Sequence, residues 1–320
     1  MIDVLRNKEV LITGATGFIG VNLVKMCLDK GAKVHIFSRK SSNRWRIKDV
    51  LKSVNEYYVD LLDYRRLKSV ISRIKPEIIL HTAVYGGYSF QRDENKIIKT
   101  NIIGTMNLVN VCSIVGFKLF VNTGSSSEYG LKNKPMKETD LLEPNNIYGV
   151  TKAAATLFCQ ERSKSLGLPI VTLRFFSPYG YYEDSRRLVS SLIISGLMKK
   201  KLKLLSPNSV RDFIFIEDVM SAYMNAIEKP NINGEIFNIG SGKQYTVKEV
   251  ANKIMNLTDS DSKYEYNNTS TRLNEPKLWV ADISKANKIL NWRPHWNIDE
   301  GLRKTIEWFK KNISLYKSFF

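Results

Sequence analysis

The sequence is poor in residues that bind metal ions or form disulfide bonds. Its 320 residues include three cysteines and three histidines, and no C-x-x-C or H-x-x-x-H spacing occurs among them, so no metal site is indicated. Each cysteine falls among apolar residues in a helix-like stretch, which predicts buried free thiols. We expect His81 to be structural rather than catalytic. The six residues are Cys27, Cys112, Cys159, His35, His81 and His295.

Long hydrophobic runs are also absent. No segment approaches the about 20 consecutive apolar residues that a transmembrane helix needs. A glycine motif begins at Thr13, and its strand must occupy the residues just before it, which leaves no room for a signal peptide. We therefore expect a cytoplasmic protein that does not associate with membranes. With 43% hydrophobic and 25% charged residues, the chain has the composition of a soluble globular protein.

Acidic residues are scarce relative to basic ones. The chain has 31 aspartates and glutamates against 49 lysines and arginines, a formal net charge of +18. Basic residues gather between Arg39 and Lys48 and again between Lys199 and Lys203. Because no nucleic-acid-binding motif accompanies them, we interpret the charge as solvated lysine faces and expect no nucleic-acid partner. A positive field would also attract dinucleotides and nucleotide-sugars.

Short apolar runs alternate with helical patterns in the first half of the chain. This order predicts a Rossmann-type doubly wound α/β fold with a parallel sheet. After about Phe176 the pattern changes, so we expect a dinucleotide-binding domain over 1–176 and a smaller substrate-binding lobe over 177–320. Some segments of the lobe, such as Glu235–Ile239, should return to the main sheet. The predicted strands are Val10–Thr13, Val34–Ser38, Tyr57–Val59, Ile78–Ala83, Leu119–Thr123 and Ile170–Phe175. The predicted helices are Phe18–Lys30, Tyr64–Ile74, Glu94–Val115, Ile147–Ser165, Arg187–Lys199 and Glu300–Asn312.

The segment T-G-A-T-G-F-I-G, Thr13–Gly20, predicts a dinucleotide site. Its glycines allow a tight turn between strand and helix and a close approach of the backbone to a pyrophosphate. The following helix then offers its N–H groups to the anion. The motif follows an apolar strand and opens a helix, which is the context it requires. We expect cofactor contacts from Gly14, Thr16, Gly17, Phe18 and Ile19.

The next strand ends at Ser38 and Arg39, without the acidic residue that would accept hydrogen bonds from the ribose of NAD. These two residues could hold a 2′-phosphate, so NADP(H) is the preferred cofactor and NAD(H) is possible. The alternative is an exposed basic loop without a cofactor role. Later strand ends and one helix add further expected cofactor contacts: Asp60, Leu61, Thr82, Ala83 and Asn101.

Tyr148 and Lys152 lie four residues apart in Y-G-V-T-K and should share one face of a helix. A tyrosine ordinarily titrates near pH ~10, and a fixed cation beside it favours the phenolate, so the pair can exchange a proton with a substrate hydroxyl. Ser125 ends the fifth strand, at the edge where open parallel sheets bind ligands, and its hydroxyl can bond a carbonyl oxygen. The predicted catalytic set is Ser125, Tyr148 and Lys152, and the last two should also contact the cofactor.

These motifs in this order resemble the extended short-chain dehydrogenase/reductase family, also called the NAD-dependent epimerase/dehydratase family. The resemblance runs from Lys8 to about Asn312 and includes S-S-S-E-Y-G, R-F-F-S-P-Y-G and R-D-F-I-F-I-E-D-V. It implies Tyr148 as acid/base, Lys152 as its activator and nicotinamide-ribose anchor, and a nucleoside-diphosphate sugar as substrate. It also implies a homodimer through two helices, which carry apolar residues such as Ile103, Val111, Ala154, Leu157 and Phe158. The expected substrate contacts are Ser126, Ser177, Arg187, Arg211 and Arg272.

Two departures from the family pattern narrow the reaction. The 4,6-dehydratases have Asp and Glu where this chain has Ser126 and Ser127. Glu128 stands one position late, and one residue of slip on a strand end turns a side chain to the opposite face. Ser177 replaces the asparagine of many 4-epimerases, and this variant resembles nucleotide-sugar 4-ketoreductases of deoxysugar biosynthesis, such as CDP-abequose and CDP-paratose synthases.

The sequence therefore predicts an NADPH-dependent reductase of a 4-keto-(deoxy)sugar carried on a nucleoside diphosphate, with Tyr148 as proton donor. The first alternative is a nucleotide-sugar 4-epimerase, which uses the same residues but retains and regenerates its cofactor. The second is a non-catalytic dinucleotide sensor, against which the intact Ser-Tyr-Lys set argues.

Overall fold

The chain forms two compact units, each built from segments that are separated in the sequence. The computed structural model describes residues 4–200, 203–259, 265–267 and 276–319. The domain division expected from the sequence, 1–176 and 177–320, stays a prediction. The first unit contains Met1–Gly130, Leu141–Phe175 and Met220–Phe237, and the second contains Leu131–Asp140, Phe176–Val219 and Asn238–Phe320.

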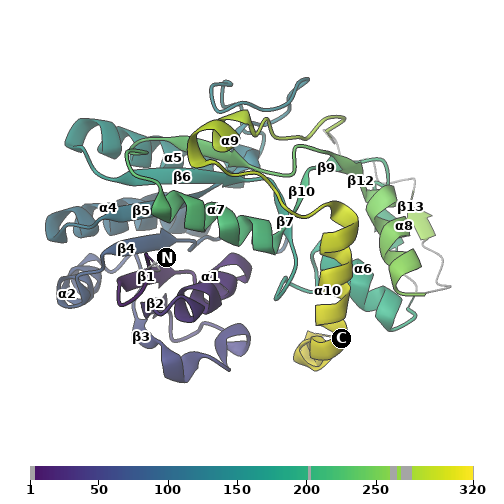
Figure 1. Cartoon of the computed structure of the whole chain (residues 1–320), viewed down its shortest axis with the longest axis horizontal. Helices are drawn as coiled ribbons and strands as arrows, with labels where there is room; N and C mark the ends of the chain where they lie inside the picture. Colours follow the sequence, from purple (N-terminus) through teal and green to yellow (C-terminus); the bar gives the residue numbers. More distant parts are fainter. Residues whose placement is uncertain (1–3, 201–202, 260–264, 268–275, 320) are drawn as a thin grey trace. The chain divides into compact units, whose positions relative to one another are not determined.

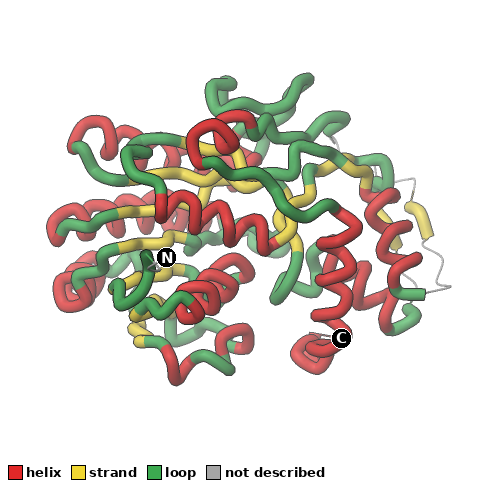
Figure 2. Tube along the Cα trace, in the orientation of Figure 1, coloured by secondary structure: helices red, strands yellow, loops and turns green. Residues whose placement is uncertain are grey.

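A seven-stranded sheet forms the centre of the first unit (Figure 2). Its strands are β1 Glu9–Thr13, β2 Lys33–Ser38, β3 Asn55–Tyr58, β4 Ile78–His81, β5 Leu119–Ser125, β6 Ile170–Phe175 and β11 Ile236–Ile239. The order is β11-β6-β5-β4-β1-β2-β3, and neighbours from β3 to β6 pair in parallel. The chain runs outward from β1 to β3 and then returns to place β4 on the other side of β1. The predicted doubly wound fold is confirmed, and this reversal is the point at which such sheets bind ligands.

Helices cover both faces of this sheet (Figure 1). They are α1 Phe18–Asp29, α2 Tyr64–Ile74, α3 Glu94–Ile98, α4 Gly104–Val115, α5 Ile147–Leu166 and α7 Ile216–Glu228. Residues of α2, α4 and α5 share one hydrophobic cluster, to which β5 contributes Phe120. Side chains alternate along a strand, so Thr123 of β5 lies on the other face. There its hydroxyl meets the Tyr223 hydroxyl of α7 at 2.5 Å.

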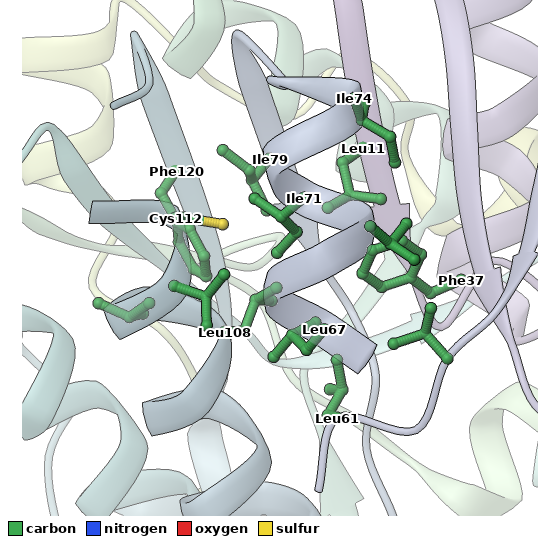
Figure 3. Close-up of a cluster of buried hydrophobic side chains, with 14 of the residues drawn as sticks. Leu11, Phe37, Leu61, Leu67, Ile71, Ile74, Ile79, Leu108, Cys112 and Phe120 are labelled. Carbon is green, nitrogen blue, oxygen red and sulfur yellow. The ribbon is translucent and has the colours of Figure 1, made fainter. Parts of the chain in front are cut away.

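The hydrophobic cluster fills the space between the sheet and helices α2 and α4 (Figure 3). The spacing of Leu67, Ile71 and Ile74 places one apolar stripe of α2 against the strands. Close packing of this layer fixes the positions of the strands relative to one another. It therefore also fixes where the loops after the strands begin. The strands contribute Leu11, Phe37, Ile79 and Phe120, and α4 contributes Leu108 and Cys112. The three cysteines are free and buried, as predicted.

The helix predicted over Glu94–Val115 contains a π-helical segment that the sequence did not indicate. Lys99–Ile103 separates α3 from α4 and contains the buried residue Asn101. Such π turns often occur at functional positions. By length and composition alone, Glu94–Val115 is the one described helix that could cross a membrane. Leu108 and Val111 of this helix are fully buried in the hydrophobic core. A buried core helix passes the same test of length and composition.

The second unit is built from short strands and helices. A central contact is the carboxylate of Asp212, which is fully buried and accepts backbone N–H groups of Ser241, Gly242 and Ala281 at 2.6, 3.1 and 3.0 Å. These bonds hold the segments that carry Ser241, Gly242 and Ala281 against the segment that carries Asp212. The elements are β7 Ser177–Tyr179, α6 Leu188–Leu197, β8 Lys203–Leu205, β9 Val210–Arg211, β10 Phe213–Phe215, β12 Tyr245–Thr246, α8 Val247–Leu257, β13 Glu265–Asn267, α9 Ser284–Leu290 and α10 Ile298–Asn312.

Candidate active site

The glycine loop between β1 and α1 packs directly against the end of β4. Gly14 has φ +70°, and a Cβ on it would lie 2.6 Å from the Ala83 nitrogen. Thr82 Oγ1 donates to the Thr13 carbonyl at 2.7 Å, so Thr82 and Ala83 border the loop, and their contact with a cofactor stays a prediction. Helix α1 begins after Gly17 without a side-chain cap, which leaves its first turn suited to an anion. These features fit the pyrophosphate of a dinucleotide.

An acidic side chain that the sequence reasoning missed lies beside the end of β2. Ser38 is buried, and its Oγ donates to Glu56 Oε1 of β3 at 2.5 Å. Arg44 Nε donates to the same oxygen at 2.6 Å, so the carboxylate already has a cation and a hydroxyl as partners. Arg39 is exposed. Only the pairing of β2 with β3 brings Glu56 to Ser38, and no local sequence signal marks it.

The remaining predicted cofactor residues surround the same edge of the sheet. Asp60 is exposed and its Oδ1 accepts the Leu62 N–H at 2.9 Å, whereas Leu61 is buried. The Asn101 amide donates to the Tyr85 carbonyl at 2.8 Å and to Thr151 Oγ1 at 2.9 Å. Thr151 lies between Tyr148 and Lys152 in the chain, so Asn101 connects the loop after β4 to the first turns of α5.

Ser125 and the first turn of α5 meet at the carboxyl end of β5. Ser125 ends the strand, and its Oγ accepts the Ser127 N–H at 3.2 Å. A Cβ on Gly149 would lie 2.4 Å from the Ser127 carbonyl oxygen, so only glycine lets α5 approach so closely. Asn146 caps the helix by accepting the Gly149 N–H at 2.8 Å. Tyr148, in this first turn, is half-buried.

Lys152 is buried beneath this surface, with 5% of the residue exposed. Burial lowers the pKa of its ammonium, and the carboxylate of Glu128 opposes that effect. On β4, His81 is hydrogen-bonded to Thr13 at 2.7 Å and Thr105 at 2.9 Å. Burial, and secondarily Lys152, lower the pKa of His81 to about 3. A neutral, buried histidine with two hydroxyl partners fits the structural role predicted from the sequence.

Glu128 is the second residue whose position the sequence did not explain. It is fully buried and forms an ion pair with Arg174 of β6, with Oε2 2.7 Å from Nε. This carboxylate is committed to Arg174 and is turned away from solvent, which agrees with the expectation that it does not replace a dehydratase carboxylate. Neither Ser126, which is buried, nor Ser127 supplies a carboxyl group.

The other predicted substrate residues belong to the second unit. The Ser177 N–H donates to the Asp212 carbonyl at 2.8 Å, which places β7 beside the strand end that carries Arg211. Arg211 lies over the Trp279 ring, 5.7 Å from its centroid. Arg187 is 3.7 Å from the buried carboxylate of Glu183, whose pKa burial raises to about 7. Arg272 lies outside the described residues.

Comparison with known proteins identifies the family. The model of the NAD dependent epimerase/dehydratase family matches residues 10–240. The chain belongs to this family. It is 29% identical over 320 residues to a UDP-glucuronate 4-epimerase of Thermodesulfobacterium geofontis, covering 96% of this chain and 98% of that protein.

Solved structures of the family share the whole fold. UDP-glucose 4-epimerase from Thermotoga maritima with UDP-glucose matches with a TM-score of 0.89 at 27% identity, over 95% of this chain and 99% of that chain. dTDP-glucose 4,6-dehydratase from Bacillus anthracis in complex with NAD matches with a TM-score of 0.86 at 25% identity, over 97% and 99%. The chain is therefore an enzyme of the NAD dependent epimerase/dehydratase family, with the fold of these solved structures. Among the described residues, no group of three His, Cys, Asp or Glu side chains could hold a metal ion.

The glycine loop gives a direct prediction. Gly14→Ala should weaken binding of NAD and NADPH by at least about tenfold, because the new Cβ would displace the end of β4 from the loop. Gly167→Ala is the matched control, since Gly167 has φ +67° but nothing lies within 4 Å of the position that a Cβ would take. It should lower stability by about 1 kcal/mol and leave cofactor binding unchanged. Isothermal titration measures both affinities, and equal affinities in the two variants would contradict this role of the loop.

Proposed function

We propose that the protein is a 4-epimerase of a nucleoside-diphosphate sugar that retains its nicotinamide cofactor. The observation that carries this proposal is the full-length similarity to UDP-glucuronate and UDP-glucose 4-epimerases, combined with a Ser125, Tyr148 and Lys152 set at the edge of the sheet. It replaces the reductase as first choice because the similarity favours epimerases, whereas the sequence argument for reduction rested on Ser177, on the segment T-G-S-S-S-E-Y-G and on the end of β2.

The chain's own residues would hold the sugar and move one proton. A bound nicotinamide cofactor would accept a hydride from the sugar and later return it. Tyr148 would take the proton of the 4-hydroxyl and give it back to the same oxygen, and Ser125 would hold that oxygen by a hydrogen bond. Lys152, as a buried cation on the same helix face, would favour the tyrosinate. Inversion also requires that the keto sugar present its other face before reduction.

Dehydration is disfavoured by the same residues. Elimination of water needs an acid and a base of the enzyme that reach the substrate. Ser126 and Ser127 occupy the two positions after Ser125, where the 4,6-dehydratases have Asp and Glu. Glu128 is bonded to Arg174 and fully buried. A carboxylate in that arrangement has no access to a sugar carbon, which supports epimerisation or reduction over dehydration.

The second candidate is the NADPH-dependent 4-ketoreductase of deoxysugar biosynthesis. The observation in its favour is Arg39, an exposed cation directly after Ser38. The nearby carboxylate of Glu56 is already neutralised by Arg44, so it repels a 2′-phosphate less than a free carboxylate would. A net reductant is usually NADPH, and a basic pocket for the 2′-phosphate would fit that use.

The two reactions separate in one assay. An epimerase incubated with UDP-glucose or UDP-glucuronic acid should convert it to the 4-epimer with no change in NADPH absorbance, and NMR of the sugar protons detects the product. Native mass spectrometry should find the cofactor bound after purification. NADPH consumed in proportion to an added 4-keto-6-deoxy nucleotide-sugar, without any interconversion, would contradict the epimerase and establish the reductase.

Cofactor preference is tested independently of the reaction. If Arg39 binds a 2′-phosphate, titration should show NADPH binding roughly tenfold or more tightly than NADH, as ~1–3 kcal/mol from a charge-assisted contact predicts. Arg39→Ala should remove the difference, and Lys30→Ala, a lysine at the end of α1, is the control. NADH binding as tightly as NADPH to the unmodified protein would refute the NADP(H) preference.

We also propose a homodimer formed through α4 and α5. Val111, one residue named for this surface, is fully buried in the core, but Leu157 is 52% exposed and Ile114 is 61% exposed. Light scattering should give twice the 36.7 kDa chain mass at micromolar concentration. Leu157→Glu should shift it toward the monomer, whereas Leu141→Glu, at an exposed loop leucine, should not. A monomer before any substitution would rule out the dimer.

We propose a cytoplasmic location, from the composition of the chain and from its similarity over almost its full length to enzymes such as UDP-glucose 4-epimerase. Fractionation of cells that express the full chain is the measurement, and recovery in a membrane or secreted fraction would contradict it.

A further inference from the structure

Glu128 is a buried carboxylate that the proposed chemistry does not use directly, yet it contacts the segment that carries Ser125. Its Oε1 accepts the Ser125 backbone N–H at 2.8 Å and the Thr156 hydroxyl at 3.1 Å. Its Oε2 accepts Arg174 Nε at 2.7 Å. One side chain thus joins the end of β5, helix α5 and strand β6, the three elements that meet at the proposed catalytic set.

The surroundings of this ion pair are built to hold it. Arg174 is 1% exposed, and its Nη1 donates to the Tyr129 hydroxyl at 2.9 Å. A Cβ on Gly124 would lie 2.8 Å from Arg174 Cγ and 2.9 Å from Glu128 Oε1. Any larger residue at position 124 would therefore displace the pair. A fully buried charge persists only when its hydrogen bonds are satisfied, and here both carboxylate oxygens have partners.

Glu128 also lies beside the helix face that carries Lys152, because it accepts the hydroxyl of Thr156, which is four residues after Lys152 on α5. Besides Glu128, the titratable groups that interact electrostatically with the Lys152 ammonium are His81 from β4 and Cys159 from its own helix. Arg174 of β6 is paired with the same Glu128 carboxylate. His81 is neutral because burial lowers its pKa to about 3, and burial raises the pKa of the Cys159 thiol to about 12. Glu128 therefore supplies the negative charge that opposes the effect of burial on Lys152.

We propose that Glu128 is a positioning residue for the catalytic set, which holds the backbone of Ser125 and supplies the counter-charge that keeps the buried Lys152 ammonium protonated. The counter-charge role of Glu128 rests on the proposed function, in which Lys152 acts beside Tyr148. Without the Glu128 charge, the Lys152 ammonium loses its proton at lower pH, and a neutral amine no longer favours the tyrosinate.

The test replaces the charge and keeps the shape. Glu128→Gln retains an oxygen that can accept from Ser125 and Thr156 but removes the charge. Relative to the unmodified enzyme, the ratio of turnover at pH 9 to turnover at pH 7 should fall by about tenfold, as expected for the loss of one close opposite charge. Glu128→Asp, which keeps the charge, should recover part of that ratio. Glu77→Gln is the control, because Glu77 is ion-paired with Lys8 and Lys118 at the other end of β4. It should leave the pH profile unchanged.

A second variant separates charge from folding. Glu128→Gln leaves Arg174 as an unpaired buried cation and can unfold the protein. The double variant Glu128→Gln with Arg174→Gln removes both charges from the core and should fold. It should retain part of the steeper loss of turnover at high pH, since Lys152 still lacks its counter-charge although removal of the Arg174 cation lessens the repulsion of the ammonium. A folded double variant with the unmodified pH profile would overturn the proposal.

A third measurement does not depend on the reaction. NMR of protein labelled with ¹³C at lysine Cε should show the Lys152 resonance, assigned by its loss in Lys152→Met, titrating at lower pH in Glu128→Gln and in the double variant than in the unmodified protein. An unchanged titration overturns the proposed counter-charge even if the protein proves to be a reductase. A shifted titration supports it even if no epimerase activity is found.

Discussion

The buried ammonium of Lys152 is the constraint on which the proposed site depends. A lysine that is 5% exposed has lost most of its hydration, and such a group stays charged only if the protein replaces what water supplied. The parallel sheet provides the replacement, because β4, β5 and β6 all end at the same edge. There they bring the turn that carries Glu128 up to helix α5.

The glycine loop and the first turn of α5 lie at this same edge, the carboxyl end of the parallel strands. The strand order reverses at β1, because β2 and β3 lie on one side of it and β4 on the other. The glycine loop and the loop after β4 therefore lie side by side, and Gly14 has no space for a side chain. The first turn of α5 packs as closely on the segment after β5, where Gly149 faces the Ser127 carbonyl. Gly14, directly after β1, and Gly149, in the first turn of α5, therefore allow the dinucleotide loop and α5 to pack closely on the ends of β4 and β5.

Local patterns were sufficient for the framework of the molecule. The Thr13–Gly20 motif, the apolar strands and the four-residue spacing of Tyr148 and Lys152 are properties of short segments, so the sequence predicted the sheet, the loop and the helix face. The structural role of His81 was also predictable. His81 lies in no motif that would make it a ligand or a base, and the structure gives it two threonine partners.

Features that depend on pairing between distant segments were not predictable. Glu56 reaches Ser38 only through the register of β2 and β3, and this weakens an argument built on the absence of an acidic residue at the end of β2. Glu128 could be described from the sequence only as a misplaced dehydratase carboxylate, because Arg174 is 46 residues away in the chain. The π-helical turn at Asn101 and the burial of Val111 likewise arise from packing.

In the proposed mechanism, Tyr148 exchanges the proton at the sugar hydroxyl while the surrounding fold holds the cofactor. The decisive experiment is Tyr148→Phe, with sugar interconversion and NADH and NADPH affinity measured on the same preparation. Turnover should fall by about 10²–10⁴-fold, the usual contribution of a general acid or base, while both cofactor affinities should stay within about twofold. Retention of more than about a tenth of the turnover would contradict it, because Tyr148 would then not be the group that moves the proton.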